Sequence, residues 1–329
     1  MKLIVNIPAF NEEENISRTI ERIKQSFRDD FYQKEGAILT EKLIQVVDDG
    51  SSDKTAEKAR QAGADLIVSY KPNRRLAYSF KRAVENSLEN RADFMVNIDA
   101  DGQFNPEDIP TLLKPLLQGQ YDMVIANRFG KHEAKNMPFI KYFLNRLAAK
   151  LVGFFLNHPI DDLTCGFRAH SQETLLKLNL TNVHFTYTQE TIIGAIGKNL
   201  KLKWIPVKVS YFADRESRIV KSISTFVLNS FKIILRAVRD VRPLKFFGLP
   251  GVFFLSVAFI GFAFFLFNYF QTFKISPFLN YIIFSSISLL LGIQLLIFAL
   301  IADMIRSNRQ VTEESLYQQK KTLLLKDRQ

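Results

Sequence analysis

Short apolar runs alternate with longer stretches of helical periodicity along the first two thirds of the chain. The apolar runs have the length of buried strands and cover residues 2–7, 43–47, 64–68, 94–98, 123–126 and 202–209. Apolar side chains recur at helical spacing near residues 12–27, 54–61, 75–88, 106–116, 139–155 and 188–197. Strands that alternate with helices in this way predict an α/β protein built on a layered sheet.

The last third of the chain has a different pattern. Residues 219–241 carry apolar side chains at helical spacing with most Lys and Arg off that line, which is typical of a helix at the lipid headgroups. Residues 246–273 and 275–302 contain no charged side chain, and each run exceeds the ~20 residues that cross a bilayer. We predict an α/β domain at 1–215, an amphipathic juxtamembrane helix at 216–245, a transmembrane hairpin at 246–302 (spans at about 246–270 and 279–302) and a tail at 303–329.

Basic residues flank both outer ends of the predicted hairpin. Arg242 and Lys245 precede the first span, and Arg306 and Arg309 follow the second. Because Lys and Arg accumulate on the cytoplasmic side of membrane proteins, we expect a two-span integral membrane protein with its α/β domain and both termini in the cytoplasm. The hairpin could also pack against copies of itself and form a homo-oligomer.

The charge of the chain narrows the choice of partners. The chain has 44 Lys and Arg against 33 Asp and Glu, a net charge of +11. Such an excess favours nucleic acid, an anionic membrane surface or phosphorylated substrates. We expect no nucleic-acid partner, because the sequence has no nucleic-acid motif and no basic helix with interleaved aromatic residues. The single cysteine, Cys165, rules out an intrachain disulfide.

Polar motifs directly follow three of the predicted strands. They are Pro8–Glu12, Asp48–Asp53 and Asp99–Gln103. Because ligands of such sheets bind beyond the carboxyl ends of the strands, we expect the three motifs to share one site. The carboxylates of Asp99 and Asp101 are hard ligands that suit Mg²⁺ or Mn²⁺, although Asp and Gly also mark ordinary turns. A metal held by paired carboxylates suits nucleotidyl or glycosyl transfer from a diphosphate.

Four motifs in series resemble those of the family 2 glycosyltransferases. The fourth, Asp162–Arg168, follows the three motifs above in the order that the family shows. The chain is similar to the dolichyl-phosphate-mannose-synthase-like branch, whose polyprenyl-phosphate glycosyltransferases carry two C-terminal spans. The resemblance implies a GT-A (nucleotide-diphospho-sugar transferase) Rossmann-like catalytic domain with Mg²⁺ or Mn²⁺. It also implies an inverting transfer, at the cytoplasmic membrane face, from a UDP- or GDP-sugar to an undecaprenyl or dolichyl phosphate.

The resemblance further implies roles for individual residues. The nucleotide base and ribose would be lined by Pro8, Phe10, Glu12, Val47 and Asp49. The metal would be held by Asp99, Asp101 and Gln103, with Ala100 touching the donor through its backbone and Arg128 facing the phosphates. Asp101 and Arg128 are therefore the catalytic candidates. The candidates for binding the acceptor phosphate are Lys141, Arg146, Arg215 and Arg218, besides Arg128.

The chain departs from the family pattern at a few positions. Phe10 stands where Tyr is usual, Arg75 where Gly is common, and Arg215 where a Gly-x-Ser-Lys motif has its Gly. The last departure weakens the assignment of the acceptor-phosphate residues and leaves the metal site untouched.

Two other functions stay open at this point. A lipid phosphate is already ionised near neutral pH and needs cations rather than a base. A glycolipid or polysaccharide hydroxyl acceptor would instead need a general base, for which Glu190 and Asp162 are the candidates. A non-catalytic, sugar-nucleotide-binding scaffold is the third possibility, against which the intact Asp99 and Asp101 argue.

Overall fold

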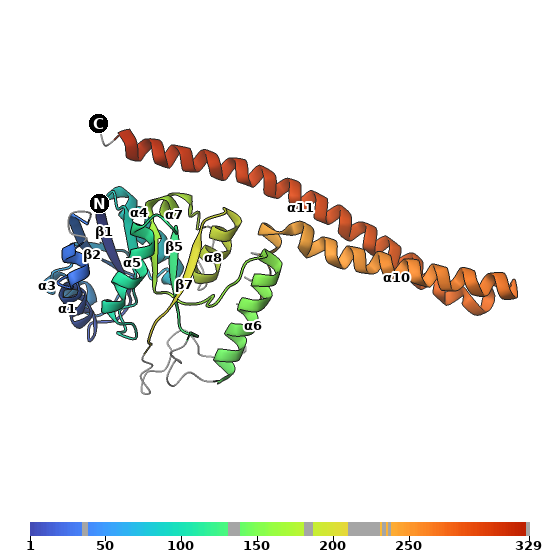
Figure 1. The fold of residues 1–329 in the computed structure, drawn as a ribbon, viewed down its shortest axis with the longest axis horizontal. Helices are drawn as coiled ribbons and strands as arrows, with labels where there is room; N and C mark the ends of the chain where they lie inside the picture. The colour runs from blue at the N-terminus through green and yellow to red at the C-terminus, as the bar shows by residue number, and fades with distance from the viewer. Residues whose placement is uncertain are drawn as a thin grey trace. The chain divides into compact units, whose positions relative to one another are not determined.

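A computed structural model gives the fold of the chain and describes residues 1–34, 39–130, 139–180, 187–209, 231, 235 and 238–326 (Figure 1). The chain divides into two compact units. One comprises residues 1–234 together with 315–329, and the other comprises residues 235–314.

A seven-stranded sheet forms the centre of the first unit. Its strands are β1 (Lys2–Ala9), β2 (Glu41–Asp48), β3 (Leu66–Ser69), β4 (Phe94–Asn97), β5 (Met123–Asn127), β6 (Arg168–Ser171) and β7 (Leu202–Pro206). Their order in the sheet is β3-β2-β1-β4-β6-β5-β7. All neighbouring pairs are parallel except those of β6, which is antiparallel to both β4 and β5.

The six strands predicted from apolar runs are confirmed, and β6 was not predicted. The sequence indicates only a polar motif at this point. The strand Arg-Ala-His-Ser is four residues long and carries two large polar side chains, Arg168 and His170, so it lacks an apolar run. Both side chains are nevertheless buried, because β6 lies in the middle of the sheet.

Helices surround the sheet (Figure 1). They are α1 (Ile16–Ser26), α2 (Asp30–Lys34), α3 (Thr55–Gln61), α4 (Arg75–Glu89), α5 (Ile109–Leu117), α6 (Phe139–Leu156), α7 (Gln172–Lys177) and α8 (Tyr187–Gly197), with a short 3₁₀ turn, η1, at Pro106–Asp108. Helices α4, α7 and α8 share one apolar core with β2 and β4, in which the rings of Phe80 and Tyr187 stack at 4.5 Å. This core brings Tyr187 to the side of β4 from which Asp99 follows.

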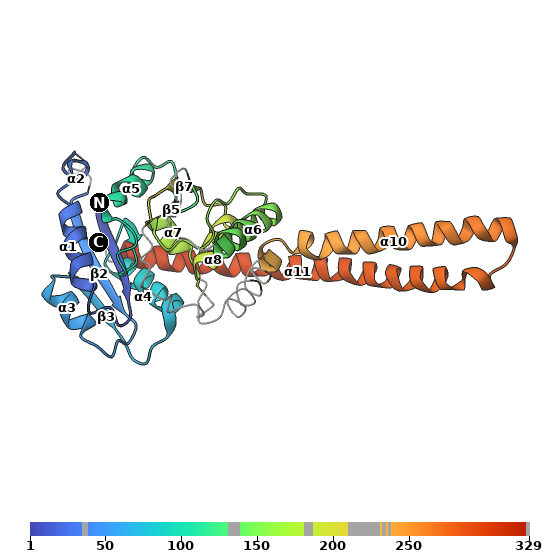
Figure 2. The same cartoon turned by 90° about the horizontal axis from the view of Figure 1, so that it is seen from below.

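The second unit consists mainly of two long helices. They are α10 (Pro243–Thr272) and α11 (Leu279–Lys326), which follows a 3₁₀ turn, η2, at Ser276–Phe278. Both are long and apolar enough to cross a membrane, with mean hydropathies of 2.3 and 2.4 over their best windows. Figure 2 shows α10 beside the first part of α11, as Figure 1 does. A β-carbon at Gly251 would lie 3.1 Å from Cδ2 of Leu296, so the small residue allows the two helices to approach closely.

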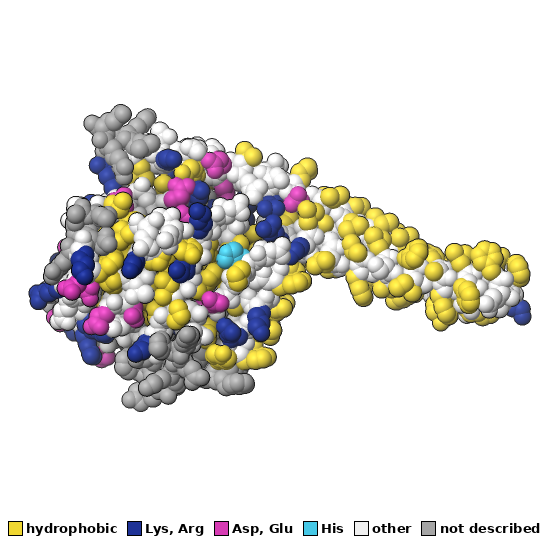
Figure 3. Space-filling model, in the orientation of Figure 1, with side chains coloured by type: hydrophobic (Ala, Val, Ile, Leu, Met, Phe, Trp, Pro, Cys, Tyr) yellow, Lys and Arg dark blue, Asp and Glu magenta, His cyan; other side chains and the backbone are white. Residues whose placement is uncertain are grey.

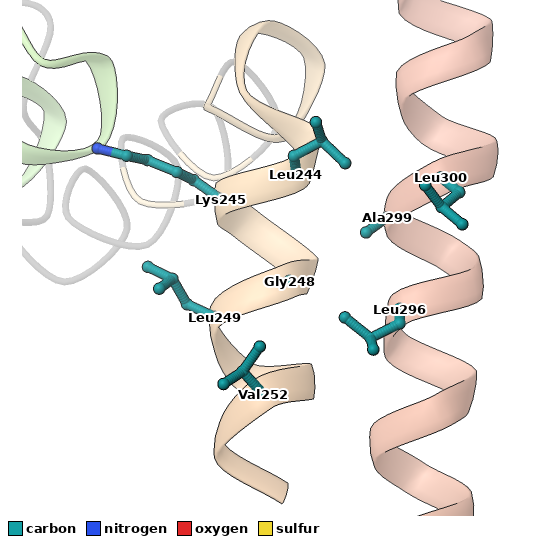
Figure 4. Close-up of a pocket in the computed structure, with 8 residues that line it drawn as sticks. All are labelled: Leu244, Lys245, Gly248, Leu249, Val252, Leu296, Ala299 and Leu300. Atoms are coloured by element: carbon teal, nitrogen blue, oxygen red, sulfur yellow. The ribbon is translucent and has the colours of Figure 1, made fainter. Parts of the chain in front are cut away.

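An open groove of about 520 Å³ lies in this hairpin, near the start of α10 (Figure 4). Its lining is almost wholly apolar and includes Gly248, Val252 and Leu296, whereas the side chain of Lys245 points away from α11 (Figure 4). Such a lining suits lipid chains and offers nothing to a charged sugar nucleotide.

The last turns of α11 belong to the first unit. Tyr317 donates a hydrogen bond to Glu173 Oε2 (2.9 Å), and Lys320 Nζ donates to Asn179 Oδ1 (3.0 Å). The described part of the predicted tail, residues 303–326, therefore continues the second apolar helix and is fastened to α7 and the residues after it. The predicted juxtamembrane helix at 216–245 lies largely outside the described residues.

Candidate active site

Strand order brings the predicted motifs to one edge of the sheet. Strands β2, β1 and β4 are adjacent and parallel, so their carboxyl ends release Asp49, Phe10 and Asp99 on the same side. Two antiparallel pairings in succession make β5 parallel to β4, so Arg128 also emerges there. For the same reason β6 begins at this edge, and the turn before it joins the site. All four motifs therefore meet at one edge of the sheet.

The turn after β4 holds the two predicted metal ligands. Asp101 Oδ1 accepts a hydrogen bond from the backbone N–H of Gln103 (3.0 Å), and Gly102 has the positive φ of +73° that this turn needs. Thr19 of α1 donates to the carbonyl of Ala100 (3.0 Å), which fixes the turn from below. The contact of the Ala100 backbone with the donor stays a prediction.

Electrostatics in this turn favours a cation. Burial and the nearby carboxylate of Asp101 raise the pKa of Asp99 to about 7, and Glu12 acts in the same direction. A divalent cation between such carboxylates would relieve both the burial and the repulsion. Within the described residues no group of three or more His, Cys, Asp or Glu side chains could hold a metal ion alone. The remaining ligands would have to be Gln103, water or phosphate oxygens.

Gly166 forms the wall against which Asp99 packs. A β-carbon at this position would lie 3.1 and 3.3 Å from the two carboxylate oxygens of Asp99 and 3.3 Å from the hydroxyl oxygen of Tyr187. Asn97 Nδ2 donates to the carbonyl of Gly166 (3.1 Å), so the turn before β6 is tied to the end of β4. Glycine lets the backbone approach the carboxylate this closely without displacing it. This explains the Gly of the fourth motif, for which sequence reasoning offered no role.

A chain of buried amides runs across the sheet beneath the site. Gln45 of β2 donates to Asn6 of β1 (2.9 Å), and Asn6 donates to Asn97 of β4 (2.7 Å). All three side chains are almost fully buried, where an amide without partners would be costly. Sequence reasoning missed these residues. Their only signal was a polar residue inside each of three apolar runs.

Arg168 is a buried cation next to the same turn. Its Nε donates to the carbonyl of Cys165 (2.6 Å), and its Nη1 donates to Thr191 of α8. Together with Arg128 it opposes the rise in the pKa of Asp99. Arg168 therefore supplies positive charge behind the carboxylates, a role that its place in the fourth motif did not reveal.

Arg128 forms a buried ion pair with Asp162. Its Nε and Nη2 lie 2.7 and 2.9 Å from the two carboxylate oxygens, and Nη2 also donates to Thr164. Thr164 in turn donates to Asn145 of α6 (3.3 Å). The guanidinium is thus held in one orientation at the strand edge, with Nε and Nη2 both engaged by Asp162. Facing the donor phosphates stays a prediction for this residue.

The carboxylate of Asp162 accepts hydrogen bonds from several donors at once. Besides the guanidinium, its carboxylate accepts hydrogen bonds from the backbone N–H groups of Arg128, Thr164 and Cys165. Although burial alone would raise it, the Arg128 guanidinium and these donors hold the pKa of Asp162 below its usual value. A carboxylate with this many donors is a poor proton acceptor. Asp162 is therefore unsuited to be the general base that a hydroxyl acceptor would need.

The predicted nucleotide pocket lies on β1 and β2. Pro8 and Val47 are paired in the strand register, and Phe10 just beyond is 41% exposed. Asp49 Oδ1 accepts from the backbone N–H of Arg74 (2.7 Å), while burial raises its pKa. Asp49 therefore organises the loop before α4 as well as being the predicted base-binding carboxylate.

The backbone at Arg75 has φ +72°. This left-handed conformation explains why Gly is common at that position of the family.

Of the remaining acceptor-phosphate candidates, only Arg146 has a side chain that the structure describes. Arg146 is partly exposed on α6. Glu190, the candidate general base, is partly buried on α8. The side chain of Lys141 and the whole of Arg215 and Arg218 lie outside the described residues.

Comparison with known proteins identifies the class to which this site belongs. The model of the family described as "Glycosyl transferase family 2" matches residues 4–178, which include all four motifs. The chain belongs to this family, and it is a glycosyltransferase with a GT-A-like fold.

Three archaeal proteins are among the relatives of this chain. The chain is 34% identical to an uncharacterised protein of Methanocaldococcus jannaschii over 72% of its own length and 91% of the relative. It is 27% identical to the glycosyltransferase AglJ of Haloferax volcanii, over 91% of this chain and 92% of the relative. It is 28% identical to the dolichol-phosphate mannosyltransferase of Pyrococcus furiosus, over 77% of this chain and 70% of the relative.

Solved structures share the fold of the first unit. Glucosyl-3-phosphoglycerate synthase of Mycobacterium tuberculosis, crystallised with Mn²⁺ and UDP-glucose, aligns with a TM-score of 0.54 and 21% identity. The alignment covers 72% of this chain and 79% of that chain. At this identity the likeness concerns the fold.

Proposed function

We propose that the protein transfers one sugar from a UDP- or GDP-sugar to a polyprenyl phosphate at the cytoplasmic face of a membrane, with inversion at the anomeric carbon. The observation that carries this proposal is the meeting of the four family motifs at one sheet edge, in a chain that also has two membrane-length apolar helices. The dolichol-phosphate mannosyltransferase among the relatives supports a lipid phosphate as the acceptor.

The donor would lie along the carboxyl ends of β2, β1 and β4. Phe10 offers an exposed ring against which a base can stack, and Pro8, Val47 and Asp49 would complete its pocket. Asp99, Asp101 and Gln103 would hold Mg²⁺ or Mn²⁺, a choice that the metal-bound structural neighbours support. When bound, this cation would offset the charge of the departing nucleoside diphosphate.

The acceptor would react without a protein base. An oxygen of the lipid phosphate, already ionised, forms a bond to the anomeric carbon while the bond from that carbon to the diphosphate oxygen breaks. Such a direct displacement requires the two reactants to be held in line. Arg128, oriented by Asp162, and Arg146 of α6 would fix the acceptor phosphate or its counterpart on the donor. The engagement of Asp162 removes one of the two candidate bases that a hydroxyl acceptor would need and leaves Glu190 as the other.

The basic flanks of the two apolar helices support a cytoplasmic active site. Arg242 and Lys245 lie at the start of α10, and Arg306 and Arg309 lie beyond the apolar part of α11. Positive residues of this kind mark the cytoplasmic ends of spans.

A donor screen tests the proposal. Full-length protein in detergent would be given radiolabelled UDP- and GDP-sugars with undecaprenyl or dolichyl phosphate, and label would be followed into the organic phase. One donor should give a lipid product that is lost with a chelator and restored by Mn²⁺. Asp101→Asn should lower the rate at least ~100-fold, whereas Glu107→Gln, on the exposed turn after the motif, should not.

Two outcomes would contradict the proposal. Transfer to a polysaccharide or glycolipid hydroxyl, with no lipid-phosphate product, would favour the hydroxyl-acceptor enzyme. Tight donor binding with no transfer to any acceptor would favour a scaffold. The anomeric configuration of the product, read by NMR, decides whether the transfer inverts.

A further inference from the structure

Gln294 is a polar side chain in the apolar part of α11. It lies within the charge-free run 275–302, eight residues before the run ends, which corresponds to ~12 Å of helix. A glutamine side chain is too short to reach the lipid headgroups over that distance. The residue is exposed on the surface of the hairpin, where hydrocarbon would offer no partner to its amide N–H groups and oxygen. Gln294 therefore requires a hydrogen-bonding partner.

The helix itself does not provide this partner. On α10, Asn268 donates a hydrogen bond to the carbonyl of Phe264 one turn earlier (2.8 Å), so its amide is satisfied within its own helix. In the part of the chain that the structure describes, the amide of Gln294 makes no hydrogen bond of this or any other kind. The two polar residues of the hairpin therefore differ, and only Gln294 is left to an external group.

Helix α10 lies on the other side of α11 from Gln294. A β-carbon at Gly292 would lie 2.8 Å from Cδ2 of Leu255, so this side of α11 packs closely on α10. The same side carries further small, buried residues, namely Ser285, Ser288 and Ala299. Gln294 follows Gly292 by two residues, which is a rotation of about 200° around the helix. The partner of Gln294 therefore lies outside the hairpin.

Gln294 belongs to a regular stripe of exposed residues on this outer side. We call it the α11 stripe, and it consists of Ile283, Ile287, Leu290, Gln294, Ile297, Ile301, Met304, Asn308 and Val311. Its apolar members are 47–72% exposed. Successive members are alternately four and three residues apart along the whole stripe. This is the heptad spacing of a seam between two helices.

The α11 stripe continues past the end of the apolar run. Figure 3 shows hydrophobic side chains over the region where Figure 1 places α10 and the first part of α11, and lipid would cover these. Met304 and Val311 lie beyond that run, among charged residues such as Arg306 and Arg309, yet they are 65 and 72% exposed. Lipid explains neither these two side chains nor Gln294. A helix packed along the whole α11 stripe would explain all three.

The chemistry of the α11 stripe points to a second copy of α11 as this helix. All copies of an integral membrane protein cross the bilayer in the same direction, so two α11 helices would meet in parallel. In a parallel pair, a seam position lies opposite the same position of the other helix. The amide of Gln294 both donates and accepts, so it is complementary to its own copy at the same depth. A single polar residue of this kind in a seam also fixes the register of the two helices.

We infer that two copies of the chain associate in parallel along the α11 stripe and that their Gln294 side chains hydrogen-bond to each other inside the membrane. This inference rests on one part of the proposed function, because it takes the two apolar helices to span a membrane. Its test needs neither donor nor acceptor, so it can fail while the transferase activity stands.

Cross-linking tests which face of α11 forms the contact. Full-length protein in phosphatidylcholine vesicles is oxidised with copper phenanthroline after Ile297→Cys, inside the apolar run, or Val311→Cys, beyond it. Both variants should give a disulfide-linked dimer, while the native Cys165 is buried and should not react. Leu300→Cys is the matched control, because Leu300 is 66% exposed but turned about 120° away from Gln294. Equal cross-linking at all three positions, or none at Ile297→Cys and Val311→Cys, overturns the inference.

Dilution in lipid measures what Gln294 contributes. Copies that carry a donor or an acceptor dye at Arg60→Cys, exposed on α3, are mixed in vesicles, and energy transfer is followed as the ratio of lipid to protein rises. Gln294→Leu should weaken the association by ~3- to ~30-fold. Asn268→Leu should leave it unchanged, because the amide of Asn268 is satisfied within α10. Equal association of Gln294→Leu and the unaltered protein overturns the inference, as does energy transfer no higher than chance proximity gives.

Discussion

Gly166→Ala offers a sharp test of how the site is built. The substitution adds one carbon at a position where it would lie 3.1 and 3.3 Å from the carboxylate oxygens of Asp99, while ordinary contacts begin near 3.4 Å. Gly166 is not among the glycines with positive φ, so the backbone itself tolerates alanine. The strain therefore falls on Asp99, which has to retreat by a few tenths of an ångström.

A displacement of this size matters for a metal ligand. Mg²⁺ binds oxygen at about 2.0–2.1 Å in a nearly ideal octahedron, and metal sites tolerate deviations of roughly 0.2 Å. Residues that orient the ligands typically change metal affinity by about 10–100-fold when they are altered. We expect the dissociation constant for Mn²⁺ to rise by about tenfold in Gly166→Ala, or about 1.4 kcal/mol.

The assay is a titration of full-length protein with Mn²⁺, in which the EPR signal of the free ion is measured. Gly194→Ala is the matched control, because a β-carbon at Gly194 of α8 meets nothing within 4 Å. It should bind Mn²⁺ as the unaltered protein does and gain up to ~1 kcal/mol in stability as a helical glycine replaced by alanine. Unaltered Mn²⁺ affinity in Gly166→Ala would show that Asp99 is not a ligand or that Gly166 does not position it.

Three further substitutions test the scaffold around the site, each by thermal unfolding followed through the single tryptophan. Asp162→Asn breaks the buried pair with Arg128 and should cost about 3–5 kcal/mol at neutral pH. The folded-state pKa of Asp162 is depressed, so its contribution to the free energy of unfolding is present above the unfolded-state pKa of ~3.9 and is lost as the pH falls through the folded-state pKa. The loss of stability in the variant should therefore shrink at acidic pH. A loss that stays constant with pH would contradict the ion pair. Asn6→Leu removes the hydrogen bond that Asn6 donates to the side-chain oxygen of Asn97 and should cost about 1–3 kcal/mol. An unchanged unfolding midpoint would argue against the buried amide chain. Tyr317→Phe removes the hydrogen bond that Tyr317 donates to Glu173 and the longer one that it accepts from Lys321, and it should cost about 0.5–1.5 kcal/mol. No loss would mean that the end of α11 is not fastened there.

Local patterns in the sequence were enough for the outline of this protein. The charge-free runs of the last third predicted α10 and the first part of α11, because a span needs only length and apolarity. Six apolar runs predicted six strands, and polar residues after three of them predicted a shared edge. The residues that would bind donor and metal were placed there by motif, and their roles stay predictions.

Only the tertiary structure showed what supports that edge. The antiparallel strand β6 has no apolar run, yet it carries the turn with Gly166 under Asp99. Arg128 and Asp162 are far apart in the chain, and no spacing rule connects them. The same holds for helix α6, since periodicity marks a helix but not which of its sides its own domain leaves uncovered. Pairing between distant segments decides these features, because it depends on strand order and packing rather than on any local pattern.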